Sequence, residues 1–307
     1  MAHSPRWSAA LAALSLLVAS HALARAPLRP YTVVLGTAQD GGVPQAGCTK
    51  ACCATGRREL VSSLALVDPA TRRWWLFDAT PDMGAQLAMM RREAPACSLA
   101  GVFVTHAHIG HYTGLMQFGR EAMGTHDVPV WAMARMRDYL ATNGPWSQLV
   151  RLHNIVLQPL AADSTVTLGD SLRVTPFRVP HRDEYSETVG FRLEGPRGVT
   201  VFLPDIDKWE RWDRSIDDVV ADATTAYLDG TFFDAAELPG RDMRDIPHPF
   251  IVESLERFAR LPAAARARVR FIHLNHTNRA ALSGSDERKR IESAGSHVAV
   301  AGERGEL

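Results

Sequence analysis

The chain has 307 residues, of which 46% are hydrophobic and 22% are charged, so it has enough apolar side chains for a sizeable core. Its 34 basic and 34 acidic residues cancel. This balance argues against nucleic acid or an anionic membrane as a partner. We expect a small-molecule substrate as the partner, and a homodimer is compatible with the composition.

The N-terminus has the layout of a secretory signal peptide. Arg6 precedes an apolar stretch over about residues 7–19, and small residues around Ala24 follow. The stretch is shorter than the roughly 20 apolar residues that span a bilayer, although an uncleaved anchor is an alternative. We therefore expect a signal peptide over residues 1–24, a single domain over 27–307, and a periplasmic or secreted protein that leaves the membrane after signal removal.

Hydrophobic patterning predicts strands with helices between them and no linker or repeat that marks a domain boundary. The expected strands cover residues 31–35, 62–67, 74–77, 101–105, 128–132, 154–159, 172–179, 189–194, 199–203, 225–229 and 269–274. The expected helices cover residues 82–92, 111–119, 135–143, 216–221 and 251–260. This is an α/β (α+β) chain with mixed sheets, but the pattern does not say how the sheets stack.

A cluster of three histidines is the strongest chemical signal. His106, His108 and His111 follow directly on the predicted strand 101–105, where a turn lets side chains two and three residues apart converge. Neutral imidazoles suit zinc, iron or manganese. A single such histidine is more simply a surface or core residue, but three within six residues favour a metal site.

Further ligand types follow other predicted strands. His181, Asp205 and His273 each lie at the carboxyl end of a strand, where open sheets place their sites. Each is weak evidence alone, but together with the histidine cluster they indicate one centre built from distant strands.

This order, His-x-His-x-x-His followed by His, Asp and His, resembles the metallo-β-lactamase superfamily over almost the whole mature chain. The resemblance implies an αββα sandwich with a dinuclear metal site at one sheet edge. It implies that His106, His108 and His181 hold the first metal, that Asp205 bridges both metals, and that His111 and His273 hold the second. It also implies that Asp78 orients the ligand loop.

The chain departs from the superfamily at Gly110, where the family usually has the aspartate that precedes the third histidine. Glycine cannot coordinate, so we expect the second metal to lack one carboxylate. The number of catalytic metals therefore stays open, and if the loop has the family's geometry, Gly110→Asp is expected to raise occupancy of the second site.

Two branches of the superfamily look closest. Several stretches resemble coenzyme PQQ synthesis protein B, namely residues 41–45, 62–66, 79–82, 229–231 and 271–278. The ligand set also resembles the cyclic phosphodiesterase of the carbon–phosphorus lyase pathway. Because the PQQ family typically lacks part of the hydrolase ligand set, the retained His106, His108 and Asp205 favour hydrolysis.

The cysteines leave alternatives open. Export permits disulfides, but Cys48, Cys52 and Cys53 lie within six residues, which fits a metal clip better. The phosphodiesterase resemblance implies a structural zinc held by three cysteines and His276. A disulfide and free thiols are the alternatives, and Cys97 is most simply a small core residue.

A metal-activated hydroxide would attack a phosphodiester or another small ester, with a lactone or β-lactam as further candidates. His248 is the first candidate for protonating the leaving group, and Asp82 and Tyr112 are others. We expect one or two catalytic zinc ions and one structural zinc ion, with iron or manganese as alternatives at the catalytic centre. The competing interpretation is a PQQ synthesis protein B-like protein, either an iron-dependent oxygenase or a protein of quinone cofactor biosynthesis or transport.

Overall fold

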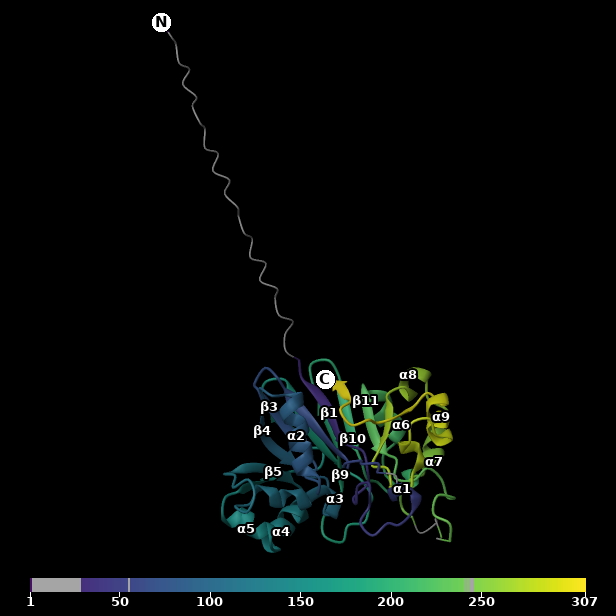
Figure 1. Ribbon diagram of the computed structural model, residues 1–307, viewed down its shortest axis with the longest axis horizontal. Helices are drawn as coiled ribbons and strands as arrows, with labels where there is room; N and C mark the ends of the chain where they lie inside the picture. The colour runs from purple at the N-terminus through teal and green to yellow at the C-terminus, as the bar shows by residue number, and fades with distance from the viewer. Residues whose placement is uncertain (2–28, 55, 241, 243–245) are drawn as a thin grey trace.

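The computed structural model describes residue 1 and residues 29–54, 56–240, 242 and 246–307. Two seven-stranded sheets lie at the centre, with helices covering the outer face of each. In Figure 1, α2, α4 and α5 lie on one side of the strands, and α6 to α9 lie on the other. The expected αββα sandwich is confirmed. The expected signal segment falls, apart from Met1, outside the described residues.

The first sheet has the order β14-β1-β2-β3-β4-β5-β6. Its antiparallel part, β14 to β3, joins a parallel part that runs from β3 to β6. Its strands are β1 (Tyr31–Gly36), β2 (Ser63–Asp68), β3 (Arg73–Phe77), β4 (Ser98–Phe103), β5 (Val128–Ala132), β6 (Ile155–Pro159) and β14 (Arg304–Glu306).

The second sheet has the order β13-β12-β11-β10-β9-β8-β7 and repeats the same plan. An antiparallel part runs from β7 to β10, and a parallel part runs from β10 to β13. Its strands are β7 (Val166–Leu168), β8 (Leu172–Arg178), β9 (Val189–Glu194), β10 (Val199–Leu203), β11 (Thr225–Asp229), β12 (Val269–Ile272) and β13 (His297–Val298).

Because side chains alternate along each strand, apolar residues pack both in the layer between the two sheets and against the outer helices. In β1, Val34 points into the layer between the sheets, whereas Val33 and Leu35 face the outer helices. The inner layer is rich in aromatic residues: the ring of Phe103 stacks on Phe77 at 4.9 Å and meets Phe191 edge-on at 5.7 Å. These strands are buried on both faces, which explains their nearly continuous apolar sequences.

The helices fill the outer layers. Over the first sheet lie α2 (Met83–Glu93), α3 (Ile109–Tyr112), the 3₁₀ helix Thr113–Phe118, α4 (Ala134–Thr142) and α5 (Trp146–Arg151). Over the second sheet lie α6 (Ile216–Asp222), α7 (Ile251–Phe258), α8 (Ala263–Arg266) and α9 (Asp286–Ser293). The short helix α1 (Ala51–Ala54) carries two of the cysteines.

Four predicted strands, 128–132, 189–194, 199–203 and 225–229, have the bounds that the structure gives them. The predicted helix over 111–119 is wrong in form, because it starts earlier as α3 and continues as a 3₁₀ helix. The predicted strand 101–105 ends at Phe103, since Thr105 turns away to bond Asp78. Among the described residues, no helix is long and apolar enough to cross a membrane.

Candidate metal centre

The site lies where the carboxyl ends of several strands meet. The segment after β4 carries the three clustered histidines, and the segments after β8, β10 and β12 carry His181, Asp205 and His273. The side chains of His106, His111, Asp205 and His273 are almost fully buried. The structure thus brings together all six residues that the sequence singled out for the catalytic metals.

One group of imidazoles comes from His106, His108 and His181. One ligand atom from each lies within 4.8 Å of the other two. Nε2 of His106 is 2.8 Å from Nδ1 of His108. Burial lowers the pKa of His106 and that of His108, which keeps both rings neutral and their lone pairs available.

Asp205 lies between this group and a second pair of histidines. Its Oδ2 is 2.9 Å from Nε2 of His111, 3.2 Å from Nε2 of His273 and 3.6 Å from Nε2 of His106. Its Oδ1 is 3.7 Å from Nε2 of His181. The carboxylate of Asp205 would therefore be available as a ligand to an ion held by either group of histidines.

The buried carboxylate of Asp78 orients the histidine loop. Its Oδ1 accepts the backbone N–H of Thr105 at 2.8 Å, and its Oδ2 accepts Nδ1–H of His111 at 2.7 Å. Oδ2 also accepts the Thr105 hydroxyl at 3.0 Å. Because that hydroxyl gives its only proton to Asp78, it accepts from Nδ1 of His106, 2.9 Å away. Both histidines therefore turn Nε2 towards Asp205.

The buried carboxylate of Asp229 likewise orients histidines in the second half of the chain. It accepts the backbone N–H and the hydroxyl of Thr231 at 2.9 and 2.8 Å, as well as the backbone N–H of Ile206 at 3.1 Å. The Thr231 oxygen then accepts from Nδ1 of His273 at 3.0 Å. Asp229 Oδ2 also lies 2.8 Å from Nδ1 of His248. The sequence analysis missed Asp229 and Thr231 as positioning residues.

The donor atoms fit a metal ion. Among the buried side-chain atoms in the described part of the chain, Nε2 of His111, Nε2 of His273 and Oδ2 of Asp205 make no hydrogen bond. Unsatisfied buried polar atoms are costly, and three that converge on one point are explained by a bound cation. Nitrogen and carboxylate oxygen ligands are those of zinc and of other first-row metals.

The pKa values show what metal binding must displace. Burial disfavours the charged forms of both Asp205 and His111. The histidines around Asp205 nevertheless hold the pKa of its carboxyl group well below the usual range. The carboxylates around His111, Asp78 first, hold the pKa of its imidazole well above 6.5 despite burial. A metal must therefore displace a proton from His111, which makes its affinity fall as the pH is lowered.

A carboxylate that the sequence analysis did not identify, that of Asp40, lies beside His111 and His273. Asp40 Oδ1 is 3.4 Å from Nε2 of His111 and accepts the backbone N–H of Gly110 at 3.2 Å. Burial raises its pKa, but His111 outweighs this and lowers the pKa to about 2. The sequence analysis missed Asp40, although it follows β1 in a glycine-flanked loop.

His248 lies at the same centre, whereas the other two candidate acids do not. Burial would lower the pKa of His248, but the Asp229 carboxylate raises it to about 9. The hydroxyl of Tyr112 instead bonds that of Tyr139 at 2.9 Å, inside the outer core. Asp82 accepts the backbone N–H of Val61. Of the three candidates, His248 is the one that shares a group of possible ligand atoms with Asp205 and His181.

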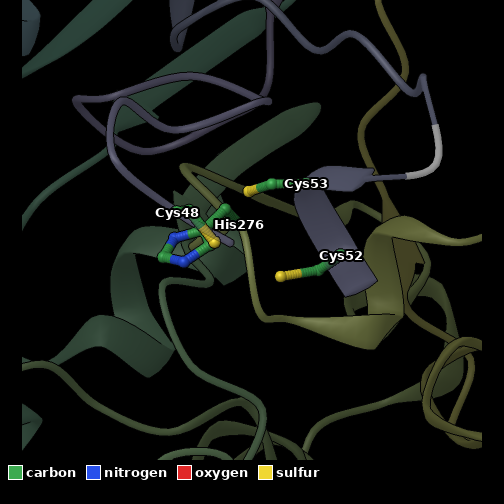
Figure 2. A group of neighbouring side chains, drawn as sticks. All are labelled: Cys48, Cys52, Cys53 and His276. Atoms are coloured by element: carbon green, nitrogen blue, oxygen red, sulfur yellow. The ribbon is translucent and has the colours of Figure 1, made fainter. Parts of the chain in front are cut away.

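A second cluster brings together Cys48, Cys52, Cys53 and His276, with one ligand atom from each within 4.8 Å of the others. In Figure 2, Cys52 and Cys53 project from α1 towards Cys48 and His276. All four cysteines of the chain are free thiols in the structure, so the disulfide alternative is not realised. Nδ1 of His276 is buried without a hydrogen bond among the described residues. Cys97 packs at the edge of the outer core, as expected.

A cleft of about 610 Å³ opens beside the candidate metal centre. Asp40 and His248 line it, together with Arg182, Phe232 and Asn275. The lining thus combines a cation and an apolar ring with two groups of the candidate centre, which suits a small anionic molecule with an apolar part.

Comparison with known proteins agrees with this geometry. Residues 73–274 match the profile of the beta-lactamase superfamily domain. The chain belongs to this superfamily. Coenzyme PQQ synthesis protein B of Ruegeria pomeroyi is 28% identical over 300 residues, covering 87% of this chain and 96% of that protein. The corresponding protein of Pseudomonas syringae pv. syringae is 27% identical, with 88% and 97% covered.

Two solved structures are similar to this chain in their fold. Zn²⁺-bound PqqB from Methylobacterium extorquens has a TM-score of 0.74 at 23% identity, covering 90% of this chain and all of that one. A diphosphatase of the PhnP family has a TM-score of 0.65 at 21% identity, covering 91% and 97%. Both likenesses concern the superfamily fold.

The Asp78 network can be tested without metal. Asp78→Asn places an amide NH₂ where Asp78 accepts hydrogen bonds from Thr105 and His111. Because a buried donor would then face donors, we expect a loss of about 1–3 kcal/mol in the free energy of unfolding. Urea unfolding of the metal-free protein measures it. The exposed Asp286→Asn serves as the control, and equal stability of the two variants would contradict the assigned network.

Proposed function

We propose that the chain is a metal-dependent hydrolase that cleaves a phosphodiester or another small ester. The observation that carries the proposal is the place of Asp205 between two groups of imidazole nitrogens, with a cleft alongside. His106, His108 and His181 would hold one ion, and His111 and His273 would hold a second. Zinc is the first expectation from the donor set, with iron and manganese as alternatives.

When bound, such ions supply a hydroxide near neutral pH and polarise the group under attack. The protein's part is to fix the ligands. Asp78 and Asp229 hold the imidazole tautomers, and Asp205 brings a negative charge to the middle of the centre. The burial of these groups excludes bulk water, which strengthens the electrostatic interactions among them.

His248 is the group that we propose protonates the leaving oxygen. Its Nδ1 lies 2.8 Å from the Asp229 carboxylate and its side chain lines the cleft, so in this proposal Nε2–H is the proton donor. The Asp229 carboxylate raises the pKa of His248 to about 9 against the effect of burial, so the ring is protonated at neutral pH. Arg182, half-exposed on the cleft wall, would attract an anionic substrate.

The first experiment measures metal content and turnover of a chromogenic phosphodiester, bis(p-nitrophenyl) phosphate, by the chain from residue 25 onwards. Asp205→Asn keeps the shape of the side chain but removes its charge, so we expect loss of at least one ion and of turnover. Arg173→Gln, at a surface ion pair, is the control. Asp205→Asn with unchanged metal content would contradict the role of Asp205, and a fully metallated wild type that cleaves no ester would contradict the proposed activity.

The role of His248 predicts a dependence on the leaving group. His248→Gln should lower kcat by about 10²- to 10⁴-fold for an alkyl ester, whose leaving oxygen needs a proton. It should change kcat little for a p-nitrophenyl ester, whose leaving group departs as an anion. Equal losses for both substrates would show that His248 acts in another way, for example as a ligand near Asp205 and His181.

We also propose that Cys48, Cys52, Cys53 and His276 hold a structural zinc ion, because three thiolates and an imidazole satisfy its tetrahedral preference. Cys53→Ser should remove one zinc equivalent and lower the melting temperature. Cys97→Ser, at a cysteine outside the cluster, is the matched control and should retain all of the metal. Equal zinc content and melting temperature in the two variants would disprove the clip.

A second candidate function follows from the match to coenzyme PQQ synthesis protein B over 87% of the chain. Under this proposal the centre would hold iron for an oxygenase reaction, or the cleft would bind a quinone cofactor during its biosynthesis or transport. Oxygen consumption by the iron-loaded protein would favour the first form. Tight quinone binding without turnover of any ester would favour the second. Export after cleavage behind Ala24 stays a proposal common to both functions.

A further inference from the structure

We propose that Asp40 is a ligand of the second catalytic metal and takes the place of the aspartate that the superfamily has at position 110. This inference rests on the proposed metal centre and deepens it. A ligand oxygen of Asp40 and a ligand nitrogen each of His111 and His273 lie within 4.8 Å of one another. Nε2 of both histidines is buried without a hydrogen bond among the described residues, and Nε2 of His111 is 3.4 Å from Oδ1 of Asp40.

Gly110 and Asp40 compete for the same space. A Cβ atom at residue 110 would lie 2.2 Å from Oδ1 of Asp40 and 2.6 Å from its Cα. No side chain can therefore occupy position 110 while Asp40 keeps its place. The backbone N–H of Gly110 also donates to Asp40 Oδ1, which fixes that oxygen 3.4 Å from Nε2 of His111. The glycine is thus what admits the replacement carboxylate.

The backbone holds Asp40 in register with His273. The N–H of Gln39 donates to the carbonyl of Leu274 at 2.9 Å, and the N–H of Leu274 donates to the carbonyl of Thr37 at 2.8 Å. Asp40 and His273 are therefore each one residue from this paired stretch, on adjoining segments. The second ion would be held by two carboxylates and two imidazoles, which restores the charge that Gly110 was expected to remove.

Zinc titration of the full-length protein against a chelator of known affinity tests the proposal. We expect the wild type to bind three ions, of which Cys53→Ser removes one. In Asp40→Asn, which keeps an acceptor for Gly110, and in Asp40→Ala, the second catalytic ion should bind at least about 10- to 100-fold more weakly, while the first is unchanged. Asp82→Asn removes a carboxylate from a neighbouring loop and should bind all three ions normally.

Gly110→Ala gives an independent check, because its methyl group displaces Asp40 without changing any ligand. We expect the same loss of the second ion as in Asp40→Ala. Wild-type affinity for the second ion in the two Asp40 variants, or in Gly110→Ala, would overturn the proposal, as would a wild type with only one catalytic ion. If both ions bind but no ester is cleaved, Asp40 keeps its role and the hydrolase proposal fails.

Discussion

The histidine loops of the centre depend on two buried carboxylates: Asp78 directly follows β3 in the first sheet, and Asp229 is the last residue of β11 in the second. Asp78 accepts hydrogen bonds from Thr105, which follows β4, and from His111. Asp229 accepts hydrogen bonds from Thr231, two residues further along the chain, and from His248. Each threonine hydroxyl is thereby left with only its lone pairs for a second histidine. An uncompensated carboxylate at these positions would be very costly, so the surrounding loops can adopt only those conformations that supply the donors.

The site residues gather several ionisable groups in one buried place. In the described part of the chain, Nε2 of His111, Nε2 of His273 and Oδ2 of Asp205 converge without a hydrogen bond. The surrounding carboxylates, Asp78 first, raise the pKa of His111 against the effect of burial. The fold thus holds the donor atoms of the candidate centre close together. A metal that binds the folded chain through them would stabilise the fold.

The sequence predicted the strands well where both faces are buried, because a short continuous apolar stretch between turn residues favours a buried strand over other structures. It placed His106, His108, His111, His181, Asp205 and His273 correctly at strand ends, since that rule needs only the order of elements. It missed Asp40 because the family comparison directed attention to position 110 alone. Whether another loop supplies a carboxylate depends on which segments the fold brings together. The local sequence around position 110 does not reveal that a Cβ there would lie 2.2 Å from Oδ1 of Asp40.

The cysteine cluster and the group formed by Asp40, His111 and His273 draw residues from the same two loops. Asp40 and Cys48 belong to the loop after β1, and His273 and His276 belong to the loop after β12. The backbone pairing of Thr37 and Gln39 with Leu274 joins these loops. A zinc ion that draws Cys48 and His276 together therefore also limits the distance between Asp40 and His273. Because ligands must be held to within about half an ångström, the proposed zinc clip would act on the geometry of the candidate catalytic centre as well as on stability.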